Sequence, residues 1–91
     1  MATDLKLQEG QRRIENEFWT QLPGKKDKPE NKIHKWDYNS DLMRYTMPVE
    51  VDGKQGRCDF SDKDVRDCLA DKTVQKRVKR QVKKLTKSLG L

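Results

Sequence analysis

The chain has 91 residues, of which 40% are charged and 32% are apolar, so it predicts one small domain, residues 1–91, with a thin core. A domain of this size buries only about 60% of the surface that its unfolded chain exposes, so we expect modest stability or help from a partner. The sequence has no apolar run near the roughly 18 residues of a membrane span, and its polar start does not resemble a secretory signal.

The formal net charge of +6 is unevenly distributed along the chain. From Lys72 onward there are eight basic residues and no acidic residue, whereas the first 71 residues carry 13 basic and 15 acidic groups. This asymmetry is typical of a basic end that binds an anionic partner, which is a nucleic acid, a membrane surface or an acidic protein.

The two cysteines, Cys58 and Cys68, are too few for a disulfide framework. We therefore predict an intracellular protein, of the cytoplasm or of the nucleoid or nucleus, with reduced thiols. A zinc site needs about four ligands, and the soft ligands here are the two cysteines and His34. The sequence predicts neither a metal site nor a cofactor.

The first helix is predicted over residues 4–22. Thr3 can cap this helix, and Asp4 suits the positive end of the helix dipole. Gly10 weakens the helix or marks a close contact. The apolar stripe of the helix consists of Leu7, Ile14, Phe18 and Leu22.

A basic loop is predicted over residues 23–32, because "LPG" ends the helix and the loop has no apolar residue apart from its prolines. We predict that this loop is mobile. Its lysines are Lys25, Lys26, Lys28 and Lys32.

Strands are expected within residues 33–60. The segment "KIHKWDY" alternates loosely, and "LMRYTMPVEV" places apolar residues on one face at period two, namely Met43, Tyr45, Met47, Val49 and Val51. Pro48 cannot donate to a sheet ladder and indicates an edge or a bulge. The segment "DGKQG" predicts a turn, after which Cys58 and Phe60 mark a short returning strand. The middle of the chain therefore predicts a small antiparallel sheet of two or three strands.

A helical region is predicted over residues 61–89. Ser61 is a good N-cap, and one apolar face begins at Val65, Cys68 and Leu69. A second stripe lies roughly on the opposite face, and it consists of Val74, Val78, Val82, Leu85 and Leu89. The change of face predicts a kink or break near residues 71–73, with a new helix capped by Thr73. Gly90 followed by Leu91 is the pattern of a Schellman C-cap, so the last segment is expected to be a true helix.

The last helix has a basic face opposite its apolar stripe. Lys76, Lys79, Arg80, Lys83 and Lys87 lie on this face, and Arg77 and Lys84 flank it. The seven cations lie within about 18 Å of helix. Like charges three or four residues apart repel by a few tenths of a kcal/mol per pair, and phosphates would relieve this repulsion. We therefore predict a small nucleic-acid-binding protein, of DNA or RNA, whose phosphate contacts give affinity without reading sequence.

Other residues and other partners fit this pattern as well. Lys25 and Lys26 are candidates to extend the nucleic-acid-binding surface, while Trp36 and Tyr38 are candidates for base stacking or for the core. The alternative function is a protein-interaction module, such as a small regulator or inhibitor, that docks on an acidic or helical protein or forms a homodimer. Its surface would be the apolar stripe of Val74, Val78, Val82 and Leu85. Membrane association is less favoured, because that stripe lacks Trp and Phe.

The order of a helix, two or three antiparallel strands and a helix resembles the double-stranded RNA-binding domain. The segment "RYTMPVEVDGK", residues 44–54, is similar to that family's middle strand and turn, and Ser61 stands where its second helix begins. The resemblance implies recognition of duplex RNA by shape across its grooves. The family's lysines just inside the second helix are not matched, because "SDKDVRD" offers only Lys63 and Arg66.

Catalytic patterns are not evident. His34, Asp37 and Asp41 form a conceivable acid–base set, but no motif fixes their geometry. Cys68 follows several acidic residues, which disfavour its thiolate. We predict a non-enzymatic α+β protein with an N-terminal helix, a small antiparallel sheet and a kinked or divided basic C-terminal helix.

Overall fold

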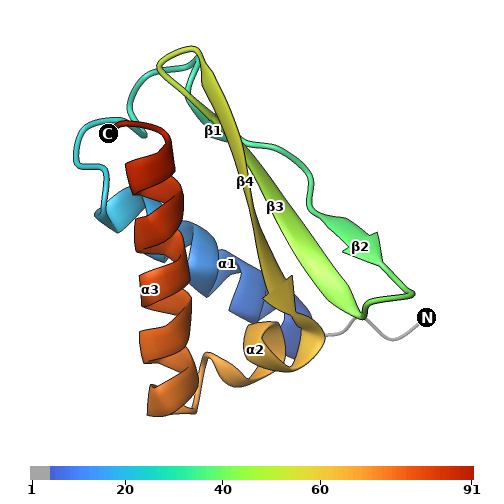
Figure 1. Cartoon of the computed structure of the whole chain (residues 1–91). Coiled ribbons are helices and arrows are strands. Elements are labelled where there is room, and N and C mark those ends of the chain that lie inside the picture. Colours follow the sequence, from blue (N-terminus) through green and yellow to red (C-terminus); the bar gives the residue numbers. More distant parts are fainter. Residues whose placement is uncertain (1–4) are drawn as a thin grey trace.

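The computed structural model describes residues 5–91, and its helices and strands follow the expected order (Figure 1). The predicted cap Thr3 and the predicted first-turn residue Asp4 lie outside the described residues. The elements are α1 (Leu5–Thr20), β1 (Lys32–Ile33), β2 (Asp37–Asn39), β3 (Arg44–Val51), β4 (Lys54–Ser61), α2 (Asp62–Asp67) and α3 (Lys72–Ser88).

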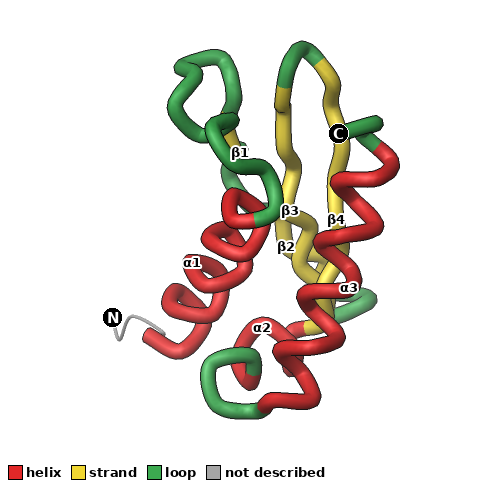
Figure 2. Tube along the Cα trace, turned by 90° about the vertical axis from the view of Figure 1, so that its left-hand side faces the viewer, coloured by secondary structure: helices red, strands yellow, loops and turns green. Residues whose placement is uncertain are grey.

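The four strands form one antiparallel sheet, and the long helices α1 and α3 cover one of its faces (Figures 1 and 2). β3 is the central strand. β4 pairs along one edge of β3, while the short strands β1 and β2 share its other edge. The protein is thus α+β, as predicted, with a sheet of four strands in which two short pieces take the place of one.

Pro48 lies opposite the point where β1 ends and β2 has not yet begun. The pairs Ile33–Val49 and Asp37–Thr46 are separated by residues 34–36 on one side and by residues 47–48 on the other. The outer edge therefore has one extra residue there, as in a β-bulge. The carbonyl of Pro48 accepts from the His34 amide at 2.8 Å, and its ring nitrogen has no hydrogen to leave unpaired. Of the two alternatives predicted at Pro48, the pairing fits the bulge, and the edge position is wrong because β3 is paired on both sides.

The β3–β4 hairpin turns over two residues, which is shorter than the predicted "DGKQG" turn. Asp52 and Gly53 have φ values of 54° and 78°, the left-handed pair that suits the twist of a two-residue hairpin. β4 therefore starts at Lys54 and pairs continuously with β3 over eight residues. Gly56 lies within this strand rather than in the turn, and a Cβ there would come within 3.0 Å of Leu85 and Leu89. The glycine thus allows α3 to approach the sheet closely.

The predicted apolar face of β3 is correct from Tyr45 to Val51, but Met43 is not part of it. Met43 has a φ of 51° in the turn before β3, and its side chain is 60% exposed. The turn is organised by Asn39, whose side-chain oxygen accepts from the amides of Asp41 and Leu42. Period-two spacing therefore extended the strand too far, because it cannot detect where a turn begins.

The helical region is divided, as predicted, into α2 and α3. Ser61 caps α2 by accepting from the Asp64 amide at 3.1 Å. The cap of α3 is Asp71 rather than Thr73, and its carboxylate accepts from the amides of Thr73 and Val74. An aspartate one residue before the helix satisfies two free amides at once, which a threonine inside the first turn cannot do.

The C-terminus of α3 has the predicted Schellman cap. Gly90 has a φ of 74°, its amide donates to the carbonyl of Lys87, and the Leu91 amide donates to that of Thr86. The last basic segment is therefore a closed helix up to its final turn.

The core lies between the helices and the sheet, and α1 joins it through a close crossing with α2. Its buried apolar residues are Ile14, Phe18, Leu22, Met47, Val49, Val51, Phe60, Val65, Cys68, Val74, Val78, Val82, Leu85 and Leu89. Gly10 is buried at the crossing, where an added Cβ would lie 1.8 Å from the Val65 carbonyl oxygen. Of the two interpretations of Gly10, the close contact is correct.

Gly10→Ala should destabilise the protein by about 2 kcal/mol or more, because overpacking against backbone outweighs the roughly 1 kcal/mol gained in helix propensity. Urea unfolding measures this change. The control is Gln8→Ala, at an exposed position of the same helix, which should leave stability unchanged or slightly raised. A stable Gly10→Ala variant would contradict the close crossing.

Candidate nucleic-acid interface

The apolar side of α3 is buried in the core of the same molecule. Val74, Val78, Val82 and Leu85, the four residues of the alternative partner surface, are between 0% and 4% exposed. The helix packs them over β4 and against α1. A partner has no access to this stripe while the domain is folded, so the structure offers it as core and not as a docking surface.

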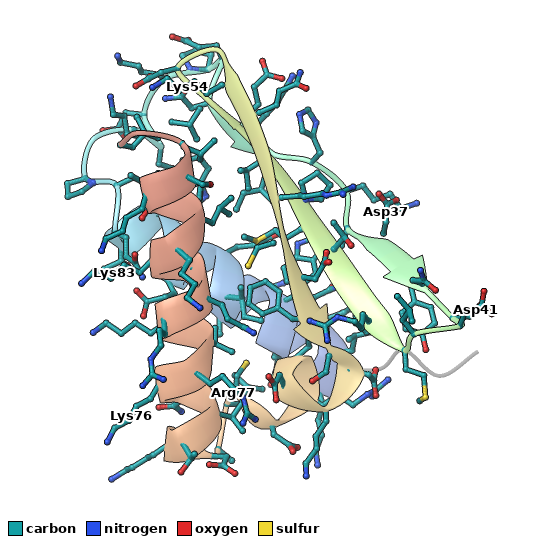
Figure 3. The ribbon with its side chains drawn as sticks, in the orientation of Figure 1. Asp37, Asp41, Lys54, Lys76, Arg77 and Lys83 are labelled. Carbon is teal, nitrogen blue, oxygen red and sulfur yellow. The ribbon has the colours of Figure 1, made fainter. Side chains whose placement is uncertain are left out.

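The opposite side of α3 presents a row of exposed cations, which we call the basic surface. It consists of Lys76, Lys79, Arg80, Lys83, Lys84 and Lys87. Figure 3 shows Lys76 and Lys83 pointing away from the sheet, on the outer side of the helix. Within residues 5–91, no member of the basic surface forms an ion pair. These charges are therefore not neutralised by the fold.

Arg77, the seventh predicted cation, differs from the other six. Its guanidinium donates two hydrogen bonds to Asp64, at 2.6 and 3.0 Å, and joins α3 to α2. This hydrogen-bonded pair raises the pKa of Arg77. Asp64 is buried, so Arg77 compensates a carboxylate inside the protein. The main contact of Arg77 is therefore the one with Asp64, which holds α3 against α2.

A basic groove of about 330 Å³ lies between α1 and α3, which also contact each other, beside the basic surface. Val78 and Cys68 contribute apolar lining, and Glu17 and Gln75 add polar groups. Its cationic lining consists of Arg13, Lys72, Lys76 and Lys79. Sequence reasoning missed Arg13, which shares its helix with several acids, and it left out Lys72. No local pattern shows that α1 turns Arg13 toward α3.

The loop that follows α1 runs near the C-terminal end of α3 (Figure 1), and its lysines are not equivalent. Lys25 donates to Asp52, whose pKa is lowered mainly by this hydrogen bond. Asn31 is buried, and its side chain bonds the Lys25 carbonyl and the Asp52 amide. The loop is thus tied to the hairpin turn at Lys25 and Asn31, and its predicted mobility stays a prediction. Lys26 is exposed and available to extend the basic surface.

The two aromatic candidates have different environments. Trp36 stacks on buried Phe60 with ring centroids 5.8 Å apart, and its indole donates to Glu15 at 2.8 Å. Tyr38 is 49% exposed and packs on Tyr45, at 4.6 Å between centroids. Trp36 therefore packs against the core, whereas Tyr38 has an accessible ring on β2, which pairs with the side of β3 opposite β4.

The residues considered for acid–base chemistry do not form a cluster. His34 pairs with Glu50 at 3.5 Å, and Asp37 and Asp41 project from the far side of the molecule from α3 (Figure 3). Burial raises the pKa of Cys58 to about 11 and also raises that of Cys68. Both thiols therefore stay protonated near neutral pH.

The part of the chain from residue 5 onward has no group of three or more His, Cys, Asp and Glu side chains placed to hold a metal ion. In the same residues, no helix combines the length and apolar character needed to cross a membrane.

Comparisons with protein-family models, curated proteins and solved structures find no significant match to this chain. The chain has a helix, four strands and two helices in sequence, and its likeness to the double-stranded RNA-binding domain stays a resemblance in the order of elements.

Val78→Asp should unfold the domain, because a buried valine is replaced by a carboxylate without a partner, at a cost of about 4 kcal/mol or more. Circular dichroism and thermal melting measure the loss. The neighbouring exposed substitution Arg80→Asp should leave the fold intact. If Val78→Asp stays folded and instead dissociates a complex, the stripe serves a partner.

Proposed function

We propose that this protein binds nucleic acid through the phosphate backbone, using the basic surface of α3. The observation that carries the proposal is the exposure of six unpaired cations on a helix whose other side is fully buried. The core fixes the rotation of the helix about its axis, so the cations are held together on one side of the molecule. Arg13 of α1 and Lys72 at the start of α3 both line the basic groove and extend the same positive region.

The charge density suits a polyanion. From Lys76 to Lys87 the helix rises roughly 17 Å. Over that length a duplex carries about ten phosphates, at one charge per 1.7 Å of its axis. A face kept only for solubility has no need to exclude acids, and acids would relieve its self-repulsion. Counterion release on phosphate binding supplies the free energy that offsets this repulsion.

The basic surface contains lysines and one arginine, and no Asn or Gln belongs to it. Lysine acts mainly as a point charge on phosphate, although Lys and Arg can also contact guanine edges, whereas adenine edges are read by Asn or Gln. We infer a binding mode that gives affinity and position along the polymer with little sequence preference.

Binding is tested by fluorescence titration of labelled duplex DNA, duplex RNA and single strands. If about six phosphates are neutralised, affinity for a duplex should fall about a thousandfold between roughly 50 and 200 mM salt. The triple variant Lys79→Glu/Arg80→Glu/Lys83→Glu should abolish binding and flatten the salt dependence. Absence of binding to every polymer at low salt would overturn the proposal.

A matched control distinguishes the effect on binding of where the charges lie from the effect of the net charge. Lys32→Glu/Lys35→Glu/Lys63→Glu changes the net charge equally at three exposed positions outside α3. This variant should retain most of the binding. Equal loss in both triple variants would mean that net charge alone, and not the basic surface, attracts the polymer.

Neutralising the basic surface should also stabilise the isolated domain. Lys79 and Lys83 are four residues apart on an exposed helix face, so Lys79→Gln/Lys83→Gln removes like-charge repulsion worth a few tenths of a kcal/mol per pair. Urea unfolding at low salt should show a small gain in stability, while the titration shows weaker binding. Exposed Lys35→Gln is the control, and a loss of stability in the double variant would contradict the account.

A further inference from the structure

The basic groove between α1 and α3 is a small concave site, which a double helix is too wide to enter. Its volume of about 330 Å³ is near the lower end of the range, about 300–1,000 Å³, that is usual for small-molecule sites. Val78 and Cys68 close its inner side, and both side chains are buried, so the floor of the groove is apolar. A duplex bound to the basic surface therefore leaves this groove unfilled.

The groove opens directly onto the basic surface. Lys76 and Lys79 belong to both, because they line the groove and are also exposed on the outer side of α3. Lys72 lies one turn before Lys76, at the start of the helix, and lines the same groove. A phosphate bound by Lys76 or Lys79 thus lies at the mouth of the groove, and the nucleotide attached to it lies within reach of the interior.

Arg13 supplies a flat cationic group on the α1 side of the groove. Burial raises the pKa of Cys68 and the charge of Arg13 opposes this rise, so the guanidinium acts on the apolar floor. Within residues 5–91, Arg13 forms no ion pair. No aromatic ring is among the described side chains that line the groove. Nucleobases stack on guanidinium planes as well as on aromatic rings, so Arg13 offers a base its stacking partner.

The groove also contains hydrogen-bonding groups that a phosphate site does not need. Glu17 on α1 accepts from the Gln21 side chain at 3.2 Å through one carboxylate oxygen, which leaves the other oxygen to accept from a ligand. Gln75 on α3 donates to the Leu69 carbonyl at 3.3 Å and keeps its side-chain oxygen as an acceptor. A carboxylate at this place repels an acidic peptide, whereas it can accept from the amino group of a base.

We propose that the basic groove binds a single unpaired nucleotide of the nucleic acid that the basic surface holds. The phosphate of this nucleotide lies against Lys76 and Lys79 at the mouth of the groove. Its base stacks on the guanidinium of Arg13 and donates from an exocyclic amino group to Glu17. The inference rests on the proposed function, because the basic surface brings the strand to the groove.

The chemistry of the groove defines which nucleotides it favours. Adenine, cytosine and guanine each carry an exocyclic amino group, and thymine and uracil carry none. A nucleotide inside a duplex has its base paired and stacked, so only an unpaired nucleotide can place its base in the groove. The protein should therefore prefer a duplex that carries an unpaired nucleotide with an amino group on its base.

Fluorescence titration compares a short blunt duplex with the same duplex carrying one unpaired adenosine nucleotide at a 3′ end. The adenosine overhang should tighten binding about tenfold, as expected for one well-placed base contact. An abasic overhang adds the same sugar and phosphate without the base, and it should bind like the blunt duplex. An overhang of thymidine on DNA, or of uridine on RNA, should gain less affinity than adenosine does.

Glu17→Ala tests the contact from the side of the protein. This variant should lose the advantage of the adenosine overhang over the abasic one, because the acceptor for the amino group is removed, while circular dichroism shows an intact fold. The matched control is Glu9→Ala, which makes the same change in charge on the same helix outside the groove and should retain the advantage. An advantage that survives Glu17→Ala, or an adenosine overhang that binds no better than the abasic one, would overturn the proposal.

The titrations distinguish a failure of this proposal from a failure of the proposed function. If the blunt duplex binds with the expected salt dependence and the adenosine overhang adds nothing, the basic surface binds phosphates and the nucleotide site is wrong. If no polymer binds at low salt, both proposals are wrong.

Discussion

The packing of α3 on β4 is the constraint on which the charge distribution of this protein depends. Gly56 leaves the sheet open at the point where Leu85 and Leu89 approach it, so the helix lies close to the strand along its apolar side. Because that side is buried, the rotation of the helix about its axis is fixed. The lysines on the opposite side of the helix therefore face the solvent, away from the sheet. The position of the basic surface is thus a result of core packing as much as of the lysines themselves.

The break between α2 and α3 allows both apolar sets of this region to be buried. The apolar residues of the region change face at its middle, and one straight helix would expose one of the two sets. Asp71 caps a new helix after the break, and the Arg77–Asp64 ion pair then joins the two helices. The arginine that sequence alone would count with the phosphate ligands is instead committed to this joint.

Most features that depend on neighbours in sequence were predictable, apart from exact boundaries, whereas features that depend on distant contacts mostly were not. The stripe of α3, its cap at Gly90 and the cap at Ser61 follow from local spacing, so the helices and the basic surface could be derived from the residues. The choice of Asp71 over Thr73 and the end of β3 before Met43 were missed, because each turns on one residue of a boundary. The groove at Arg13 and the tie between Asn31 and Asp52 required knowing which segments meet in space.

The crossing of α1 and α2 at Gly10 has a consequence for the order in which the chain acquires its structure. During synthesis α1 is made before the other described elements, yet Val65, which it contacts at Gly10, follows 55 residues later. The hairpin of β3 and β4 and the pairing of β4 with α3 use residues closer in sequence, and such contacts close with less loss of chain entropy. Ile14 and Phe18, on the apolar side of α1, therefore cannot be fully buried until the later segments of the domain have been synthesised.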